Sequence, residues 1–453
     1  MSPTLIVAGP ASFIQRSMWA IAQRHRAVPF NVIALPWRVR GALDADRLAA
    51  ALTDVVDRHP ALRTRLVMVG GQLMQAVAAT EPLAPMPTDV GGATSECRLN
   101  AALALLRDAT RMPINIVAGP PLRALWLRLD ADDHVLALIV HHAVCDGWSR
   151  QIIVDDLVAF YAARLRGEPA RLAPLSMSVV DHAQEQIETA DRGGYAAELA
   201  YWRDELDGLA PPVALPVVAP RKGHRDFRAA APRSLHDAQT LAALQARARG
   251  RRVSTFALLL ASLAVLLHQR SGSEDIVIGV PTLGRWSPQA MTFVGCATNM
   301  LPARIRIDPA HSFDELAAAV HATIRRLLAY GRVPLELVLR EIQHPMLSRP
   351  GFPVWSQLLA TPPAVMVAGS TTTFAPLPVE RGALLSEIDI DMLESAAGLQ
   401  CEFAHRPALF GAEIMQGLMA GWSVLTATLA NGGSPHVEQL SSRLTPPPAT
   451  HVT

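Results

Sequence analysis

The residues with the clearest potential for chemistry lie at 141–149, where the chain reads His-His-Ala-Val-Cys-Asp-Gly-Trp-Ser. They follow a continuous apolar run from Leu136 to Val140, which is typical of a buried strand. An imidazole, with an unperturbed pKa of about 6.5, can exchange protons at neutral pH. Asp146 can orient an imidazole or pair with an arginine, and Gly147 permits close approach to the backbone. This junction is the candidate catalytic site.

Other uses of these residues are open from the residues alone. A single histidine at a strand end is often structural, and neighbouring strand side chains point to opposite faces, so only one of His141 and His142 should face a cavity. Diverging histidines are poor co-ligands, and a metal site would need a third ligand beside His142 and Asp146, so we expect no metal. The sequence has no GxSxG elbow for a serine nucleophile and no GxGxxG or GxxxxGK[ST] phosphate loop.

The flanking residues predict how the junction is held. Alternating apolar residues indicate a strand over Leu122–Leu129, and a turn at 130–133 connects it to a second strand over His134–Val140. The second strand should be central and covered on both faces. A helix is expected from about Ser149 to Leu165, so the histidines lie between a buried strand and a helix.

The rest of the chain alternates helices and strands without a repeat, which predicts a mixed α/β fold. We place an N-terminal lobe at 1–175, a C-terminal lobe at 176–440 and a disordered tail at 441–453. A Pro-rich crossing segment is expected at 211–233. The clearest other elements are helices that begin at the capping box of Ser12 and Gln15 and that cover 45–58, 254–268 and 413–429, and a strand over 275–280.

Composition limits the partners. The 453 residues carry 41 Lys+Arg and 40 Asp+Glu, a net charge of +1, so nothing indicates binding to nucleic acid or an anionic membrane. The longest apolar run, Phe256–Leu267, is shorter than the roughly 18–20 residues that span a bilayer, and no signal peptide is evident. The four cysteines have no CxxC spacing, which favours a reducing cytoplasm over disulfides or structural zinc.

The junction also resembles a known signature. HHxxxDG at 141–147 is similar to the motif of condensation domains of nonribosomal peptide synthetases, relatives of chloramphenicol acetyltransferase. The resemblance extends from about Ser12 to Leu440 through further motifs: Ser12-x-x-Gln15-x-x-x-Trp19, Arg58-His-Pro-Ala-Leu-Arg63-Thr64, Tyr201-Trp202 with Leu206, Gly208 and Leu209, Ser271 to Arg285 with Gly295 and Asn299, Val333-Pro-Leu-Glu336, and Leu409-Phe410.

This resemblance implies two chloramphenicol-acetyltransferase-like lobes in a V-shaped pseudo-dimer with the active site in a central tunnel. A donor acyl group would arrive as a thioester on the phosphopantetheine arm of a carrier protein, with no other cofactor, and the nucleophile would enter from the opposite mouth. His142 would be the catalytic residue, either as a base or by positioning the nucleophile, and the backbone at Gly147 would lie beside the reaction centre. His141, Asp146 and Arg285 would be structural, the last two as a pair. The remaining tunnel candidates are Trp148, Ser149, Cys296 and Asn299.

Details of the motifs narrow the subfamily. Ser149 after Gly147-Trp148 resembles condensation rather than epimerization domains, and His141 argues against heterocyclization domains, which have aspartate there. Cys296-Ala297-Thr298 before Asn299, Met300 after it, and Asp181 as a weak match to YxDYAxW depart from the family pattern. These departures leave the substrate type undefined.

We therefore expect a freestanding cytoplasmic monomer that meets an acyl or peptidyl carrier protein in trans. It would join the carried acyl group to a small-molecule amine or alcohol, forming an amide or ester in natural-product assembly or chain release. Two alternatives are an acyl-CoA-dependent acyltransferase and a non-catalytic condensation-like module that binds carriers or recruits another protein. Since carrier proteins are usually acidic, docking would need a local arginine patch or an apolar groove.

Overall fold

The computed structural model describes residues 5–209, 215–221, 226–342, 352–432 and 435–442. They form two compact units: the chain up to Gly194 joined by Leu283–Thr298 and Pro362–Gly382, and a second unit of Tyr195–Thr282, Asn299–Thr361 and the residues from Ala383 onward. The predicted lobes, 1–175 and 176–440, divide the chain only once. The observed units are discontinuous because strand pairing with β2 holds one later segment in the first unit and a buried ion pair holds the other.

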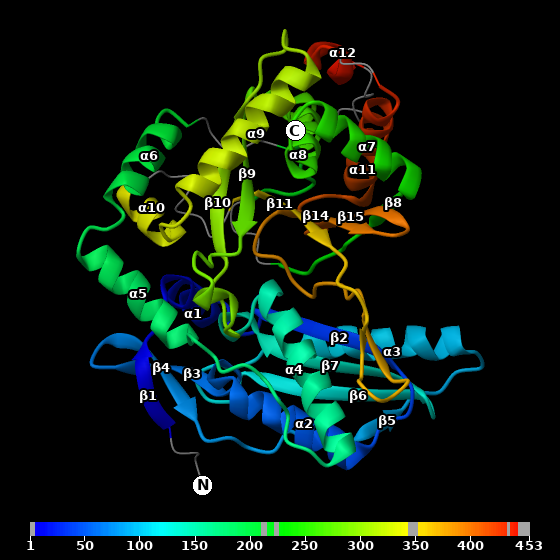
Figure 1. Ribbon diagram of the computed structural model, residues 1–453. Helices are drawn as coiled ribbons and strands as arrows, with labels where there is room; N and C mark the ends of the chain where they lie inside the picture. Colours follow the sequence, from blue (N-terminus) through cyan, green and yellow to red (C-terminus); the bar gives the residue numbers. More distant parts are fainter. Residues whose placement is uncertain (1–4, 210–214, 222–225, 343–351, 433–434, 443–453) are drawn as a thin grey trace. The chain divides into compact units, whose positions relative to one another are not determined.

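The main sheet of the first unit has six strands in the order β12-β13-β2-β7-β6-β5 (Figure 1). Their bounds are β2 Val32–Arg40, β5 Pro87–Asp89, β6 Leu122–Asp130, β7 Asp133–His141, β12 Val365–Met366 and β13 Thr373–Pro376. The predicted hairpin is confirmed as β6 and β7, in which Leu122 lies opposite Val140. On the other side of β7 lies β2, which the sequence did not predict, with Val32 opposite His141.

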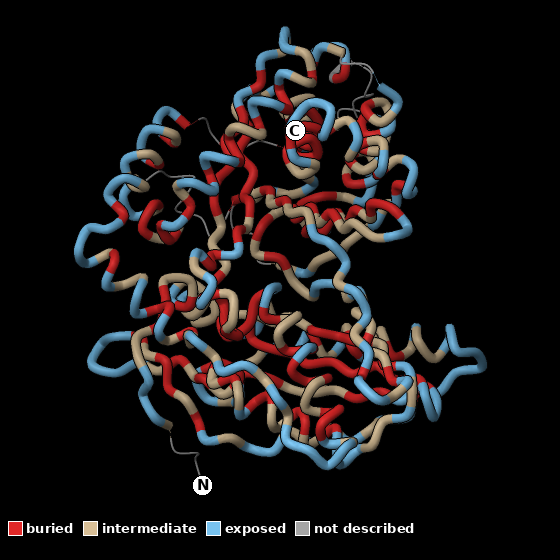
Figure 2. The backbone as a smooth tube through the Cα atoms, viewed as in Figure 1, coloured by how far each residue is buried: buried red, intermediate tan, exposed pale blue. Residues whose placement is uncertain are grey.

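Strand β7 is buried at all nine positions, as predicted for a central strand covered on both faces (Figure 2). Alternate residues of a strand point to opposite faces, so β7 supplies two cores. Leu136, Leu138 and Val140 pack with helices α2 (Ala45–Arg58) and α4 (Gly147–Arg166). Ala137 and Ile139 pack with α3 (Ser95–Thr110). The strand that ends at His141 therefore has no solvent-facing side.

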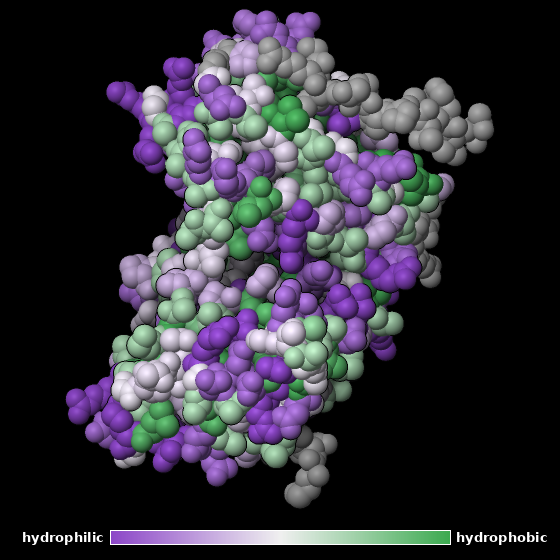
Figure 3. Space-filling view, turned by 90° about the vertical axis from the view of Figure 1, so that its right-hand side faces the viewer, coloured by the Kyte–Doolittle hydropathy of each residue, from purple (hydrophilic) through white to green (hydrophobic). Residues whose placement is uncertain are grey.

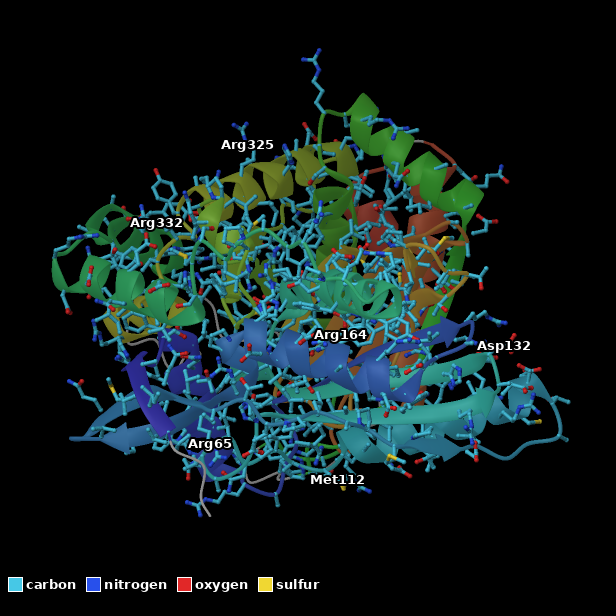
Figure 4. All side chains as sticks on the ribbon, turned by 60° about the horizontal axis from the view of Figure 1, so that its bottom comes forward. Arg65, Met112, Asp132, Arg164, Arg325 and Arg332 are labelled. Carbon is cyan, nitrogen blue, oxygen red and sulfur yellow. The ribbon has the colours of Figure 1, made fainter. Side chains whose placement is uncertain are left out.

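Helices α2 and α4 pack against each other through polar as well as apolar contacts. Arg164 of α4, labelled in Figure 4, forms two hydrogen bonds with the carboxylate of Asp54 at 2.9 and 2.7 Å. One turn further along, at the C-terminus of α2, the carboxylate of Asp156 accepts from Arg58 and contacts His59 Nε2, each at 2.8 Å. These bonds fix the axis of α4 relative to α2. Helix α2 matches the predicted range, and α4 ends at Arg166 before Gly167, whose φ of 69° favours glycine.

A second, three-stranded sheet in this unit has the order β1-β4-β3. Its strands and the remaining elements of the unit are β1 Leu5–Pro10, β3 Thr64–Val69, β4 Gln72–Ala78, α1 Phe13–Arg24, α5 Val179–Asp191 and the short 3-10 turns η1 Pro60–Arg63, η2 His142–Val144 and η3 Gln289–Met291. The predicted capping box at Ser12 and Gln15 is present at the start of α1.

The second unit is built on a six-stranded sheet in the order β10-β9-β11-β14-β15-β8. Its elements are α6 Ala196–Leu206, β8 Arg233–Asp237, α7 Ala238–Gly250, α8 Thr255–Ser271, β9 Asp275–Thr282, β10 Asn299–Arg306, α9 Phe313–Ala329, α10 Leu335–Ile342, β11 Val354–Ala360, β14 Ile388–Ser395, β15 Gly398–His405, α11 Ala412–Ala430 and α12 Val437–Ser442. The apolar run Phe256–Leu267 lies in α8, whose residues Ala257–Leu267 are all buried. Among the described helices none can cross a membrane alone, and α7 with α8, bent by 103°, is the one pair that meets the length and composition required.

Two other expectations fall partly outside the described residues. Residues 443–453 of the predicted tail are not described, and Ser441 and Ser442 end α12. In the crossing segment, residues 215–221 and 226–232 contain no helix and no named strand before β8 begins.

On the face drawn in Figure 3, polar residues predominate and apolar residues form small, separate groups.

Candidate active site

The two histidines of the junction occupy different environments. His141 ends β7, and its imidazole is only 2% exposed; its Nδ1 accepts a 3.2 Å hydrogen bond from the Ala143 amide. His142 begins the turn η2 and is half-buried. The separation of the rings thus comes from the end of the strand after His141, rather than from alternation along a strand that contains both residues.

His141 is held as a neutral imidazole. Burial, together with the neighbouring His142, lowers the pKa of His141 to about 3. Because its Nδ1 accepts a hydrogen bond, the ring proton resides on Nε2. A group with this pKa carries no exchangeable charge near neutral pH, which suits a structural role.

His142 has the opposite tautomer. Its Nδ1 lies 2.8 Å from the carbonyl oxygen of Cys145, which can only accept, so Nδ1 carries the proton. The Cys296 thiol contacts the same nitrogen at 3.9 Å. No described residue forms a hydrogen bond with Nε2, which therefore keeps its lone pair for an incoming group.

Asp146 fixes the loop between His142 and α4. Its carboxylate, 1% exposed, accepts from the amide and hydroxyl of Ser149 (2.9 and 2.7 Å), the Ala297 amide (3.0 Å) and Arg285 Nη2 (3.0 and 3.2 Å). The bond from the Ser149 amide makes Asp146 the N-cap of α4, which begins at Gly147 rather than at the predicted Ser149. One carboxylate thus binds a helix start, a neighbouring segment and a buried guanidinium.

Arg285 also uses its two Nη groups on the segment that contains it, whereas its Nε has no partner among the described residues. Nη1 donates to the carbonyls of Ala290 and Phe293 at 2.6 and 2.9 Å, and Nη2 also donates to that of Gly295 at 3.1 Å. The guanidinium carbon lies 4.1 Å from the centre of the Phe293 ring. This single side chain folds residues 285–295 around itself and joins them to Asp146.

His182, on α5, packs beside Arg285 and Phe293 and was not identified as a site residue from the sequence. Its ring is 6% exposed and lies 5.4 Å from that of Phe293, the same ring that Arg285 contacts. Burial and the nearby Arg285 charge lower the pKa of His182 to about 4. The only sequence signal was its position after Asp181, in the weak match to YxDYAxW.

The proposed tunnel residues separate into different roles. Ser149 is fully buried and its hydroxyl is used by Asp146 and by the backbone of Gly295, so it belongs to the structural network. Cys296 is buried beside His142, and burial raises the pKa of its thiol. Trp148 is 36% exposed and donates from its indole to the Met291 carbonyl at 3.0 Å. Of the first-unit candidates, only Trp148 presents substantial surface.

Asn299 belongs to the second unit, where its carboxamide performs a structural task. Its Nδ2 donates to the carbonyls of Gly331 and Val333 at 2.9 and 2.8 Å, and its Oδ1 accepts from the Leu335 amide at 3.0 Å. Both amide hydrogens are therefore used to shape the turn between α9 and α10. The expectation that Asn299 contacts substrate has no support in this arrangement.

Gly147 is exposed, and a Cβ added to it would meet no atom within 4 Å. Its φ is not in the left-handed region, so neither space nor backbone conformation requires glycine here. The fold would accept a side chain at the start of α4. This leaves close approach by another molecule as a reason for glycine.

Two buried glutamines support the other side of the histidine turn. Gln15 Nε2 donates to the carbonyl of Ala143 and to Gln75 Oε1, each at 3.1 Å, and its Oε1 accepts from the Ser12 amide at 2.9 Å. Gln75 donates in turn to the Pro10 carbonyl at 2.9 Å. The motif Ser12-x-x-Gln15 thus holds the residue after His142 in place. Gln75, on β4, carried no sequence signal.

No group of three or more His, Cys, Asp or Glu side chains within the described ranges is arranged to hold a metal ion. The polar groups of the site are instead tied to one another and to the backbone. The arrangement supplies one half-buried imidazole with a free Nε2 on a rigid loop, next to an unobstructed helix start.

Residues 8–444 match the Condensation domain family, and the chain therefore belongs to that family. It is 33% identical over 334 residues, 73% of its length, to phosphinothricin tripeptide synthetase PhsC of Streptomyces viridochromogenes. It spans 31% of that relative, 13% of the isonitrile lipopeptide synthase of Mycobacterium tuberculosis and only 2% of cyclosporin synthetase simA of Tolypocladium inflatum.

Two solved structures have a similar fold. SgcC5 from Streptomyces globisporus, crystallised with (R)-(-)-1-(2-naphthyl)-1,2-ethanediol and sucrose, has a TM-score of 0.81 and 25% identity, covering 93% of this chain and 98% of its own. The X-domain in complex with OxyB from teicoplanin biosynthesis has a TM-score of 0.80 and 23% identity, covering 97% of each chain. The predicted family and its mixed α/β, two-lobed fold are confirmed, and condensation domains use substrates tethered to carrier proteins.

Replacing Asp146 should destabilise the first unit far more than replacing an exposed helix cap. Asp146→Ala leaves Arg285 buried without its carboxylate, which should lower the free energy of unfolding by about 3–5 kcal/mol. The control is Asp44→Ala, because Asp44 also caps a helix and pairs with an arginine, but at the surface; it should cost about 1 kcal/mol. Urea unfolding of both variants measures the difference. Equal losses would contradict the central role of the buried pair.

Acid should destabilise the protein through its neutral buried histidines. Because the pKa values of folded His141 and His182, about 3 and 4, lie below the unfolded value, the unfolded state binds more protons as pH falls. The free energy of unfolding should decrease below about pH 6.5, by up to about 1.4 kcal/mol per pH unit for each histidine. His182→Phe should make the decrease shallower. A stability that stays flat between pH 7 and 5, measured by urea unfolding, would contradict this.

Proposed function

We propose that this protein transfers an acyl group from a phosphopantetheine thioester on a carrier protein to a free amine or alcohol, forming an amide or ester. The observation that carries the proposal is the state of His142: Nδ1–H is bound to the Cys145 carbonyl, and Nε2 has a free lone pair. Membership of the Condensation domain family also supports the proposal.

In the proposed step, the acceptor nitrogen or oxygen attacks the thioester carbonyl while His142 Nε2 takes the proton of the nucleophile. The tetrahedral intermediate then collapses with cleavage of the C–S bond, and the proton passes to the departing thiolate. A thioester is already activated, so alignment of the two substrates is the larger task, worth about 7–11 kcal/mol. The base contributes about 10²–10⁴-fold.

The rigidity of the loop suits a mechanism in which alignment of the substrates contributes more than the base. A base must stay within hydrogen-bond reach of the nucleophile, and the position of His142 is supported by Gln15 on one side and by the Asp146–Arg285 pair on the other. The bond from Nδ1 to Cys145 also stabilises the imidazolium that forms when Nε2 is protonated, because Nδ1–H remains a donor. We assign His142 the role of general base on these grounds.

The assay must distinguish the proposed function from two alternatives. An acyl-CoA donor would present the same phosphopantetheine thioester without a carrier protein. A module that only recruits another protein is the second, since the X-domain of similar fold was solved in complex with OxyB. For the acceptor, the diol bound to SgcC5 is a reason to test alcohols beside amines.

His142→Ala should abolish most transfer without unfolding the protein. The protein is incubated with acyl-loaded carrier protein or acyl-CoA and a panel of amines and alcohols, and products are followed by intact mass. We expect a loss of about 10²–10⁴-fold. The control is His268→Ala, because the Nδ1 of His268 also binds a backbone carbonyl, that of Ser273, at 2.9 Å. Wild-type rates in the His142 variant would refute the assignment, and transfer from CoA alone would overturn the carrier donor.

Gly147→Ala should show whether glycine at this position is required for the reaction or for the fold. Since a Cβ at Gly147 meets no protein atom, the melting temperature should not fall. If substrates pass close to this backbone, kcat/KM should decrease about tenfold or more, because small misplacements cost up to about 10²-fold. Gly250→Ala, another helical glycine with free space around its Cβ, is the control. Full activity of the Gly147 variant would remove the backbone approach from the mechanism.

A further inference from the structure

A small pocket in the first unit lies beside the same helix that begins at Gly147. It is shallow, with an enclosed volume of about 10 Å³, roughly that needed by one water molecule, and it opens to solvent. Its walls come from β2, from α4 and from the segment Pro362–Pro376. Its lining is mainly apolar, with the aromatic side chains of Trp37 and Phe374 and several prolines. Arg150 is the one charged residue of the lining, so the pocket combines apolar walls with a single cation.

The pocket lies against the same helix that begins at the candidate active site. The residues of α4 that line it are Arg150, Gln151 and Val154, which follow Gly147 by three, four and seven positions. Residues with this spacing share one face of a helix. Arg150 stands one turn beyond Gly147, about 4.5 Å along the axis at 1.5 Å per residue. Along the helix, Arg150 is therefore close to Gly147.

Arg150, unlike Arg285 and Arg38 of the same unit, has no carboxylate partner among the described residues. Arg285 binds Asp146, and Arg38 binds Asp133 through two hydrogen bonds of 2.9 and 2.6 Å. Among the described residues, Arg150 donates only to the carbonyls of Pro36 and Leu377, at 3.2 and 3.4 Å, and its Nε has no partner. Desolvation lowers the pKa of Arg150, which reflects a buried cation without a counter-ion. The nearby carboxylate of Asp155 binds Gln151 instead.

A purely structural role for Arg150 has a direct parallel in the protein. Arg123 also donates from one nitrogen to two carbonyls, of Ala109 and Met112 at 3.0 and 2.8 Å, and also has a buried Nε without a partner. Burial lowers the pKa of Arg123 as well. Of these two arginines, only Arg150 lines the pocket. Arg123 is therefore the matched control for what such an arginine does when it only holds the backbone.

We propose that this pocket binds a carboxylate carried by one of the substrates, with Arg150 as its cationic partner. The inference rests on the proposed transfer reaction and names the substrate class. A carboxylate would supply the missing counter-ion and use the donors that remain on the guanidinium, which matches carboxylate geometry. The apolar walls would hold the carbon atoms next to it. The carboxylate can come from the acceptor, as in a free amino or hydroxy acid, or from a dicarboxylic acyl donor.

The test measures discrimination between substrates that differ only in the carboxylate. The acceptor pairs are phenylalanine with phenylalaninamide and leucine with leucinamide; the donor pair is succinyl- with butyryl-loaded carrier protein. The full-length wild-type, Arg150→Gln, Arg150→Lys and Arg123→Gln proteins are compared by kcat/KM. The ratio within a pair is decisive, because a loss of stability would lower both rates together. Arg150→Lys keeps the charge and guards against a variant that fails to fold.

We expect the wild-type protein to prefer the carboxylate member of the acceptor pairs or of the donor pair by about 10–100-fold, the range of a charge-assisted hydrogen bond. The pair that shows the preference identifies the source of the carboxylate. Arg150→Gln should reduce the ratio to near unity, Arg150→Lys should retain part of it, and Arg123→Gln should leave it unchanged. No preference in the wild-type protein, or equal ratios in the wild-type and Arg150→Gln proteins, would overturn the inference; so would an equal loss in the Arg123 variant.

A complete lack of transfer would refute the proposed function but would leave the pocket testable. In that case binding is measured directly, by the thermal shift that succinate, phenylalanine and phenylalaninamide produce. Stabilisation by either carboxylate ligand but not by the amide, in the wild-type and Arg123→Gln proteins and not in Arg150→Gln, supports the pocket. Absence of such stabilisation, or its survival in Arg150→Gln, rejects it.

Discussion

The buried pair of Asp146 and Arg285 is the interaction on which the first unit depends. Both side chains are almost fully excluded from solvent, and each forms several further hydrogen bonds, with only Nε of Arg285 left without a partner among the described residues. Removing two charges from water is costly, and good geometry with additional hydrogen bonds is what offsets that cost. The pair joins the start of α4 to residues 285–297, which lie far from it in sequence. The loop that carries His142 ends at this pair, so its conformation is fixed by the same contacts.

Around that pair, most polar side chains of the site form their hydrogen bonds within the fold. Ser149 binds Asp146 and Gly295, Gln15 binds the carbonyl after His142, and His141 is buried as a neutral ring. Buried polar groups must find partners, so a rigid loop needs many such residues. In the described histidine loop, Nε2 of His142 is a ring nitrogen that forms no hydrogen bond within the fold. This arrangement fits a reaction whose donor is already activated and which needs little more than alignment and the transfer of one proton.

The fold class, the hairpin β6–β7 and helices α2, α8 and α11 were predictable because strong periodicity or uninterrupted apolar runs define them. Strand β2 was missed, because Pro36 interrupts its apolar run. The sequence also did not reveal that segments 283–298 and 362–382 belong to the first unit. No local pattern encodes a pairing such as that of Phe374 with Val39. Such pairings are set by tertiary contacts.

In the candidate site, too, residues that belong to a local motif could be predicted, whereas residues defined by tertiary contacts could not. His142, Asp146, Gly147 and Arg285 were found because a motif names them, and the structure places Asp146 against Arg285 as the resemblance implied. Motif membership did not separate substrate contact from structural use. Ser149 and Asn299 were both expected at the tunnel, yet the hydrogen bonds of each are used within the fold. Gln75 and His182 show the reverse case, because each becomes significant only through a neighbour distant in sequence.

The proposed carboxylate pocket and the buried pair lie on different faces of α4. Ser149 faces the buried pair, and its contacts hold the loop at the start of α4. Arg150, Gln151 and Val154 lie on another face, at the pocket whose opposite wall comes from the segment Pro362–Pro376. Arg150 joins this face to the backbone through the carbonyls of Pro36, on β2, and of Leu377, which follows that segment. In the proposed reaction, the residues that fix His142 would thus be separate from those that contact the substrate carboxylate, so one loop geometry would serve different substrates.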